Sequence, residues 1–209
     1  MNSSAPASAD LLQRLRRAVR PLHDPPLPPG WNHAEIADVL GEGPRRAAAV
    51  LVPVIERAGA LSVLFTLRNA HLNQHAGQVS FPGGAVEPGD ADALAAALRE
   101  THEEVGIARE LVHPLGFLDC FETISGFSVT PVVAQVDAGY QALPDPREVA
   151  DVFEVPLEFF LDAQNLKRRR IDWRGKPRDI FDFPYNGRNI WGATAAMLLS
   201  LVRRLEATT

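Results

Sequence analysis

The sequence predicts an α/β fold in which a β-sheet lies between helices. Two β-rich runs, 47–55 and 61–68, stand close together, and an amphipathic helix pattern that ends at Gly106 follows them. Further strand patterns and a closing helix pattern come later in the chain. A sheet covered by helices accounts for this order. The 209 residues, 46% of them hydrophobic, are enough for one domain with a substantial core.

The N-terminal part predicts a helix and then an extended segment. Residues 9–20 form an amphipathic, basic helix pattern. The Pro-rich stretch 23–31 cannot be helical, because proline removes helical hydrogen bonds. The runs 47–55 and 61–68 then predict a hairpin that turns at 57–59.

The rest of the chain predicts two more strand pairs and two more helices. They are strands 112–123 and 127–136 turning at Ser125-Gly126, a short helix at 156–162 that opens on proline, a hairpin of 168–173 and 179–185 around Gly175, and a closing helix at 191–206. With no internal repeat or inter-domain linker, we expect a single domain over 1–209. Residues 1–45 are its helical and Pro-rich extension, and 46–209 are its core.

Composition excludes some classes of function. The formal net charge of −5 argues against a general nucleic-acid binder, which carries a basic surface. The single cysteine, Cys120, rules out an internal disulfide and fits a reducing, cytoplasmic environment. The apolar run 47–55 is too short to span a bilayer, and no targeting signal stands out.

Three glutamates near the end of the predicted helix point to metal chemistry. Glu100, Glu103 and Glu104 are spaced i, i+3 and i+4, which places them on one helix face. Such carboxylates repel one another, and a divalent cation reverses that penalty. The alternative is a solvated surface helix whose glutamates pair with Arg99 and other bases. We expect the opposite, buried stripe to contain Leu94, Leu98, Thr101 and Val105, with a cap at Asp90 or Asp92 and a left-handed end at Gly106.

This segment resembles the Nudix box, G-x5-E-x7-R-E-U-x-E-E-x-G-U, where U is a bulky aliphatic residue. The matching positions are Gly84, Arg99, Glu100, Glu103, Glu104, Gly106 and Ile107. Asp90 stands where the first glutamate is expected, the gap to Arg99 is one residue longer, and Thr101 occupies an aliphatic position.

A second motif lies directly upstream. Residues 64–84, LFTLRNAHLNQHAGQVSFPGG, are similar to the signature L-L-T-x-R-S-x3-R-x3-G-x3-F-P-G-G of Nudix coenzyme A pyrophosphatases. The matches are Thr66, Arg68, Gly77, Phe81, Pro82, Gly83 and Gly84. Asn69 and Asn73 replace the serine and the second arginine, and the lost cation weakens the expected contact with a substrate phosphate.

The resemblance implies a Nudix-type sandwich with a mixed sheet and a metal-dependent diphosphatase. We expect Mg²⁺ or Mn²⁺ on Glu100, Glu103 and Glu104, completed by the backbone carbonyl of Gly84. Glu100 is the alternative water-orienting base. We expect Arg99 to hold the glutamates by charge-assisted hydrogen bonds.

A late acidic residue, Glu148, is a candidate general base or extra metal ligand. Its alternative is an exposed loop acid beside Arg147.

The implied substrate is coenzyme A, cleaved to 3′,5′-ADP and 4′-phosphopantetheine. Arg68 is the candidate cation for the 3′-phosphate, or else a strand-end surface arginine. Gly83 and Gly84 allow a turn whose amides face an anion. Phe81 is a candidate substrate contact, or else a core residue. Weaker candidates are the run 167–170, His71 and His75.

Other Nudix substrates, and one function other than catalysis, stay open as alternatives. They are ADP-ribose, reduced dinucleotides, dinucleoside polyphosphates, and a catalytically silent nucleotide-binding module. Homodimers are common in the family and stay open for this chain, and we expect a small-molecule substrate and no nucleic-acid partner.

Overall fold

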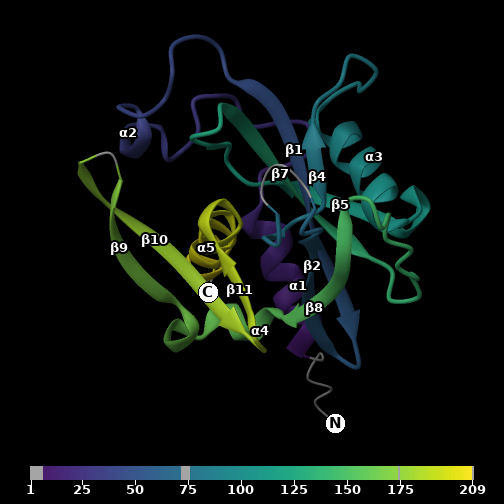
Figure 1. Ribbon diagram of the computed structural model, residues 1–209. Coiled ribbons are helices and arrows are strands. Elements are labelled where there is room, and N and C mark those ends of the chain that lie inside the picture. The colour runs from purple at the N-terminus through teal and green to yellow at the C-terminus, as the bar shows by residue number, and fades with distance from the viewer. Residues whose placement is uncertain (1–6, 72–75, 174, 209) are drawn as a thin grey trace.

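The computed structural model describes residues 7–71, 76–173 and 175–208, and it places a mixed sheet between helices (Figure 1). The strands of this sheet are β1 (Arg46–Arg57), β2 (Ala60–Arg68), β3 (Val79–Ser80), β4 (Gly83–Ala85), β5 (Val112–Phe117), β6 (Phe121–Glu122), β7 (Phe127–Val136) and β8 (Val149–Pro156). The order β3-β2-β1-β7-β5 forms its main path, and β4, β6 and β8 pair with β1, β7 and β2. Only the β1–β7 pair is parallel among these strands, so the sheet is mixed as predicted.

The first hairpin forms where the sequence predicts it. β1 and β2 are antiparallel, with Arg57 paired to Ala60. Ala58 and Gly59 between them both have positive φ, which lets the chain reverse in two residues.

The helices cover both faces of the sheet. They are α1 (Ala7–Ala18), α2 (His33–Ile36), α3 (Ala93–Val105), α4 (Leu157–Leu161) and α5 (Gly192–Glu206), with 3₁₀ turns η1 (Arg109–Leu111) and η2 (Ala163–Asn165). Side chains alternate along β1, so Leu51 and Ile55 pack with α3, while Val52 and Val54 face the core that α1, α4 and α5 close. The predicted αβα sandwich is therefore confirmed.

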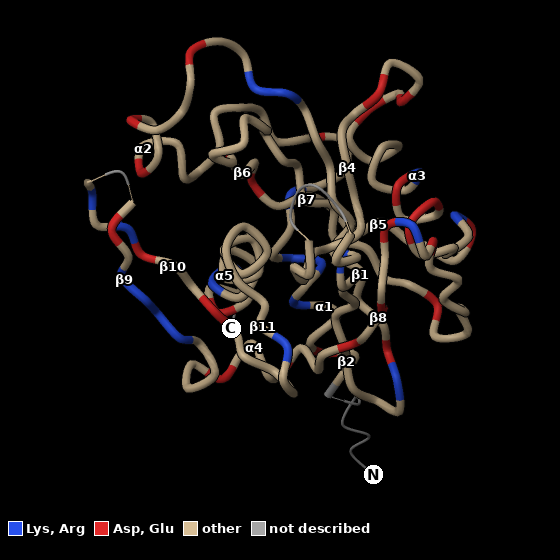
Figure 2. The backbone as a smooth tube through the Cα atoms, in the orientation of Figure 1, with Lys and Arg blue, Asp and Glu red and all other residues tan. Residues whose placement is uncertain are grey.

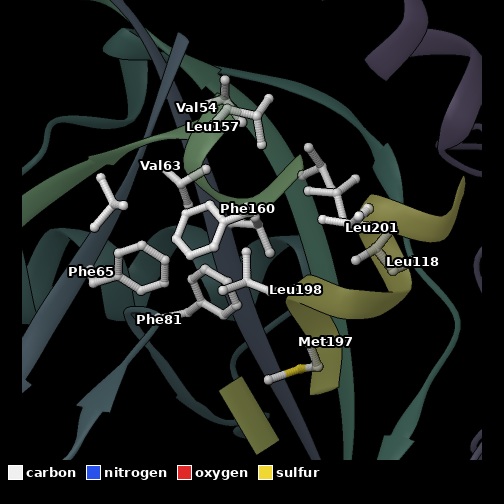
Figure 3. Close-up of a cluster of buried hydrophobic side chains, with 14 of the residues drawn as sticks. Val54, Val63, Phe65, Phe81, Leu118, Leu157, Phe160, Met197, Leu198 and Leu201 are labelled. Atoms are coloured by element: carbon white, nitrogen blue, oxygen red, sulfur yellow. The ribbon is translucent and has the colours of Figure 1, made fainter. Parts of the chain in front are cut away.

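The core on the face of the sheet that α1, α4 and α5 cover is rich in aromatic residues (Figure 3). Phe65 of β2 stacks on Phe81 at 5.1 Å between ring centroids and meets Phe160 of α4 at 5.8 Å. Leu198 and Leu201 of α5 complete this side. The apolar packing fixes β2, and β2 leads directly into the candidate site.

A second, smaller sheet was not predicted as a separate layer. The hairpin around Gly175 forms as expected, from β9 (Lys167–Trp173) and β10 (Lys176–Tyr185), and β11 (Arg188–Trp191) joins it. The order is β11-β10-β9. β8 and β11 were missed, and the predicted strand 112–123 is divided into β5 and β6, both paired with β7.

Candidate active site

Helix α3 presents the acidic side chains, and its ends are defined as predicted. The carboxylate of Asp92 accepts a hydrogen bond from Ala95 N at 2.8 Å, and Gly106 ends the helix with φ of 74°. Leu98, Thr101 and Val105 are buried, whereas Leu94, expected in the same stripe, is only partly buried.

Arg99 joins the acidic groups of this helix to the preceding loop. Its Nη1 donates to Glu100 Oε1 at 3.0 Å and to Glu103 Oε2 at 2.9 Å. Its Nε and Nη2 donate to the two carboxylate oxygens of Asp90 at 3.0 and 2.9 Å. The Arg99 guanidinium, with the Glu87 amide, lowers the pKa of Asp90. Asp90 therefore supports Arg99, while Asp92 caps the helix.

Glu104 is the buried carboxylate of the site. It is 3% exposed, its Oε2 accepts from Gly83 N at 3.1 Å, and its Oε1 lies 3.4 Å from Arg68 Nη1. Burial raises its pKa to about 7, although the Gly83 amide and the Arg68 charge oppose the shift. The neighbouring charges of Glu100 and Glu148 raise it further.

Glu100 lies against the glycine turn. A Cβ added at Gly84 would overlap the Glu100 carboxylate, so only glycine leaves room for this approach. Burial raises the pKa of Glu100, Arg99 opposes the shift, and the charges of Glu103 and Glu148 add to it.

Glu148 lies in a different part of the chain, but its charge acts on the same glutamates of α3. It is exposed in the loop that precedes β8, and its charge raises the pKa of both Glu100 and Glu104. The structure thus places Glu104 and Glu100 against Gly83 and Gly84, within the electrostatic influence of Glu148. Glu103 differs, because Arg99 holds it at the surface with 56% of its side chain exposed.

Several weaker candidates lie elsewhere. Phe81 is 2% exposed within the aromatic core, which corrects the expectation that its side chain contacts substrate. Arg168 and Arg170, from the run 167–170, pair with Asp179 on β10. Figure 2 shows this basic strand far from α3. Asn73 and His75 lie outside the described residues, and His71 is exposed.

The donor chemistry fits a hard divalent cation. The carboxylates of Glu100 and Glu104, with the Gly84 carbonyl, are the oxygen ligands that Mg²⁺ and Mn²⁺ prefer. Two carboxylates with raised pKa values gain from a nearby positive charge. In residues 7–71, 76–173 and 175–208, however, no three His, Cys, Asp or Glu side chains converge closely enough to hold a metal as they stand. Arg99 and the Gly83 amide hold these glutamates instead.

Membrane insertion by a helix finds no support in the described part of the chain. None of its helices is both long and apolar enough to cross a bilayer.

Comparison with known proteins adds family membership to this geometry. The family model described as NUDIX domain matches residues 44–174. A protein of Enterobacter sp. (strain 638), named an uncharacterized Nudix hydrolase NudL, is 40% identical over 168 residues, covering 80% of this chain and 85% of the relative. The protein of the same name from Citrobacter koseri is 42% identical over 161 residues, covering 77% and 83%. Among solved structures, a C. elegans Ap4A hydrolase binary complex aligns with a TM-score of 0.47 and 26% identity, covering 53% of this chain and 80% of that one.

Proposed function

We propose that this chain, which belongs to the Nudix family of hydrolases, cleaves the diphosphate bond of coenzyme A and its derivatives, giving 3′,5′-ADP and 4′-phosphopantetheine. The observation that carries the proposal is the approach of Glu100 and Glu104 to the Gly83–Gly84 turn, where the charge of Glu148 also acts on both carboxylates. Carboxylates at an anion site need cations, which suits a metal-dependent diphosphatase.

The reaction adds water to one phosphorus while the bridging oxygen leaves with the other phosphate. We assign metal binding to Glu100, Glu103, Glu104 and the Gly84 carbonyl. A bound Mg²⁺ or Mn²⁺ would neutralise phosphate charge and acidify a coordinated water.

The remaining roles belong to the chain. Glu148 takes the proton of the attacking water as general base, with an extra metal ligand as its alternative role. Arg99 keeps the Glu100 and Glu103 carboxylates oriented, and the Gly83 amide orients Glu104.

The upstream motif supports coenzyme A among the diphosphate substrates. Residues 64–84 are similar to the signature of coenzyme A pyrophosphatases, and Arg68 from this motif borders the acidic group. Its side chain is 24% exposed and its guanidinium lies beside Glu104, so it would supply positive charge to a substrate phosphate bound next to the acidic group. We assign Arg68 to the 3′-phosphate.

A selectivity measurement tests this assignment. We expect the wild type to prefer coenzyme A over dephospho-coenzyme A in kcat/KM, and Arg68→Ala to reduce that ratio by about tenfold, the effect of one charge-assisted contact. Arg170→Ala is the matched control, because Arg170 is exposed on the distant β9 and should leave the ratio unchanged. An unchanged ratio in Arg68→Ala contradicts the assignment. Faster turnover of ADP-ribose, NADH or a dinucleoside polyphosphate would make that compound the substrate in place of coenzyme A. Binding without any turnover would favour a catalytically silent nucleotide-binding module.

Other expectations from the sequence also stay proposals. We propose a cytoplasmic protein of one domain that acts on a small molecule, and we propose a homodimer.

A further inference from the structure

We infer that Asn69 is a positioning residue for the loop that carries Glu148 past the end of α3, where Glu104 lies; the inference rests on the proposed function. Asn69 stands where the upstream motif has serine, and it follows directly after β2. It acts through the loop 143–148, which joins the region after β7 to β8.

Asn69 binds this loop at two points. Its side-chain Nδ2 donates to Pro146 O at 2.7 Å, and its backbone N donates to Glu148 O at 2.8 Å. Its Oδ1 also accepts from His71 N at 3.3 Å, which orients the amide. The side chain of Asn69 therefore holds Pro146, and its backbone holds Glu148, so together they connect the end of β2 to the residues on either side of Arg147.

The other end of the loop is bound to α3. Leu143 N donates to Val105 O at 2.7 Å, and Asp145 N donates to Glu104 O at 3.0 Å. These bonds satisfy helix carbonyls that would otherwise lack partners. A Cβ at Gly106 would lie 2.8 Å from Leu143 Cβ, so glycine also permits this close packing.

Within the loop, a compact turn carries Glu148. Glu148 N donates to Asp145 O at 3.0 Å, and Arg147 N donates to Asp145 Oδ1 at 2.9 Å. Glu148 itself is exposed, so the position of its carboxylate depends on the backbone that carries it. The loop is held between α3 and Asn69. Loss of the Asn69 side-chain amide removes the bond to Pro146 O and leaves the backbone bond to Glu148 O, so the turn that carries Glu148 loses one of its two links to the end of β2.

A double-mutant cycle tests the inference on the full chain with Mg²⁺ and coenzyme A. The variants are Asn69→Ala, Glu148→Gln and the double variant. Asn165→Ala is the matched control, because Asn165 Nδ2 makes the same kind of bond, to Phe159 O at 2.9 Å, in the turn before β9. Thermal unfolding of each variant, measured in parallel, checks that the protein is folded at the assay temperature.

The expected result is a loss confined to kcat. We expect Asn69→Ala to lower kcat about tenfold with KM nearly unchanged, since small misplacements of a reacting group have effects of this size or larger. In the Glu148→Gln background the same substitution should change kcat by less than about twofold, because the group it positions is gone. Asn165→Ala should retain wild-type kcat.

Two results overturn the inference. Equal losses in both backgrounds would mean that Asn69 acts independently of Glu148, while the proposed function would stand. Absence of turnover by the wild type with coenzyme A and with every other Nudix substrate would overturn the proposed function, and the catalytic part of this inference with it.

Discussion

Replacing the buried carboxylate should stabilise the metal-free protein while abolishing its activity. Glu104 is 3% exposed, and burial raises its pKa from the ordinary value of 4.5 to about 7. Between these pH values the folded state keeps a proton that the unfolded state has lost. The free energy of unfolding therefore falls as pH rises through this window, and the loss is complete above the folded pKa. Glutamine cannot ionise, so Glu104→Gln removes this pH-dependent loss in the free energy of unfolding.

The size of the effect follows from the shift. A difference of about 2.5 pKa units corresponds to about 3 kcal/mol at pH 8, and to less than about 1 kcal/mol at pH 5, close to the unfolded value. For a chain of this length, about 3 kcal/mol raises Tm by about 10 °C. The assay is urea unfolding of wild type and Glu104→Gln in a chelator, at several pH values between 5 and 8.

A matched variant and added metal sharpen the test. Glu103→Gln changes an exposed glutamate of the same helix and should shift stability by less than about 0.5 kcal/mol. Mg²⁺ at about 100 times its Kd should stabilise the wild type by about 2.7 kcal/mol and Glu104→Gln by much less. Equal stability of wild type and Glu104→Gln at pH 8, or a gain that does not change with pH, would show that ionisation of buried Glu104 does not lower stability.

Three further substitutions test other parts of the site. Gly84→Ala places a methyl group where the Glu100 carboxylate lies, so steady-state kinetics should show kcat reduced at least about tenfold in a folded protein; normal turnover would show that the close approach is dispensable. Arg99→Lys keeps the charge but loses the fork that binds several carboxylates, and metal titration of activity should show a loss of about 10- to 100-fold. Phe81→Ala should lower the free energy of unfolding by about 3–5 kcal/mol and leave KM unchanged, and a raised KM would restore its role in substrate binding.

The acidic helix could be predicted because its signals are local. Glu100, Glu103 and Glu104 follow helical spacing, and Gly106 ends the helix as its φ allows. The hairpin of β1 and β2 was also predictable, since its turn residues lie between two apolar runs. These features need only neighbouring residues.

Contacts between distant segments could not be predicted in the same way. The pairing of β8 with β2 brings Glu148 to α3, and no local pattern specifies that partner. Asp90 looked like a cap or a departure from the motif, yet the folded loop turns its carboxylate toward Arg99. The division of α3 glutamates into buried Glu104 and exposed Glu103 depends on the sheet beneath the helix, which spacing alone does not show.

The most direct test of the central claim is chromatographic analysis of the products formed from coenzyme A. We expect equal amounts of 3′,5′-ADP and 4′-phosphopantetheine from the wild type with Mg²⁺ or Mn²⁺. Neither product should form in a chelator or with Glu104→Gln. Intact coenzyme A in the presence of metal, with the wild-type protein folded, would rule out coenzyme A as the substrate.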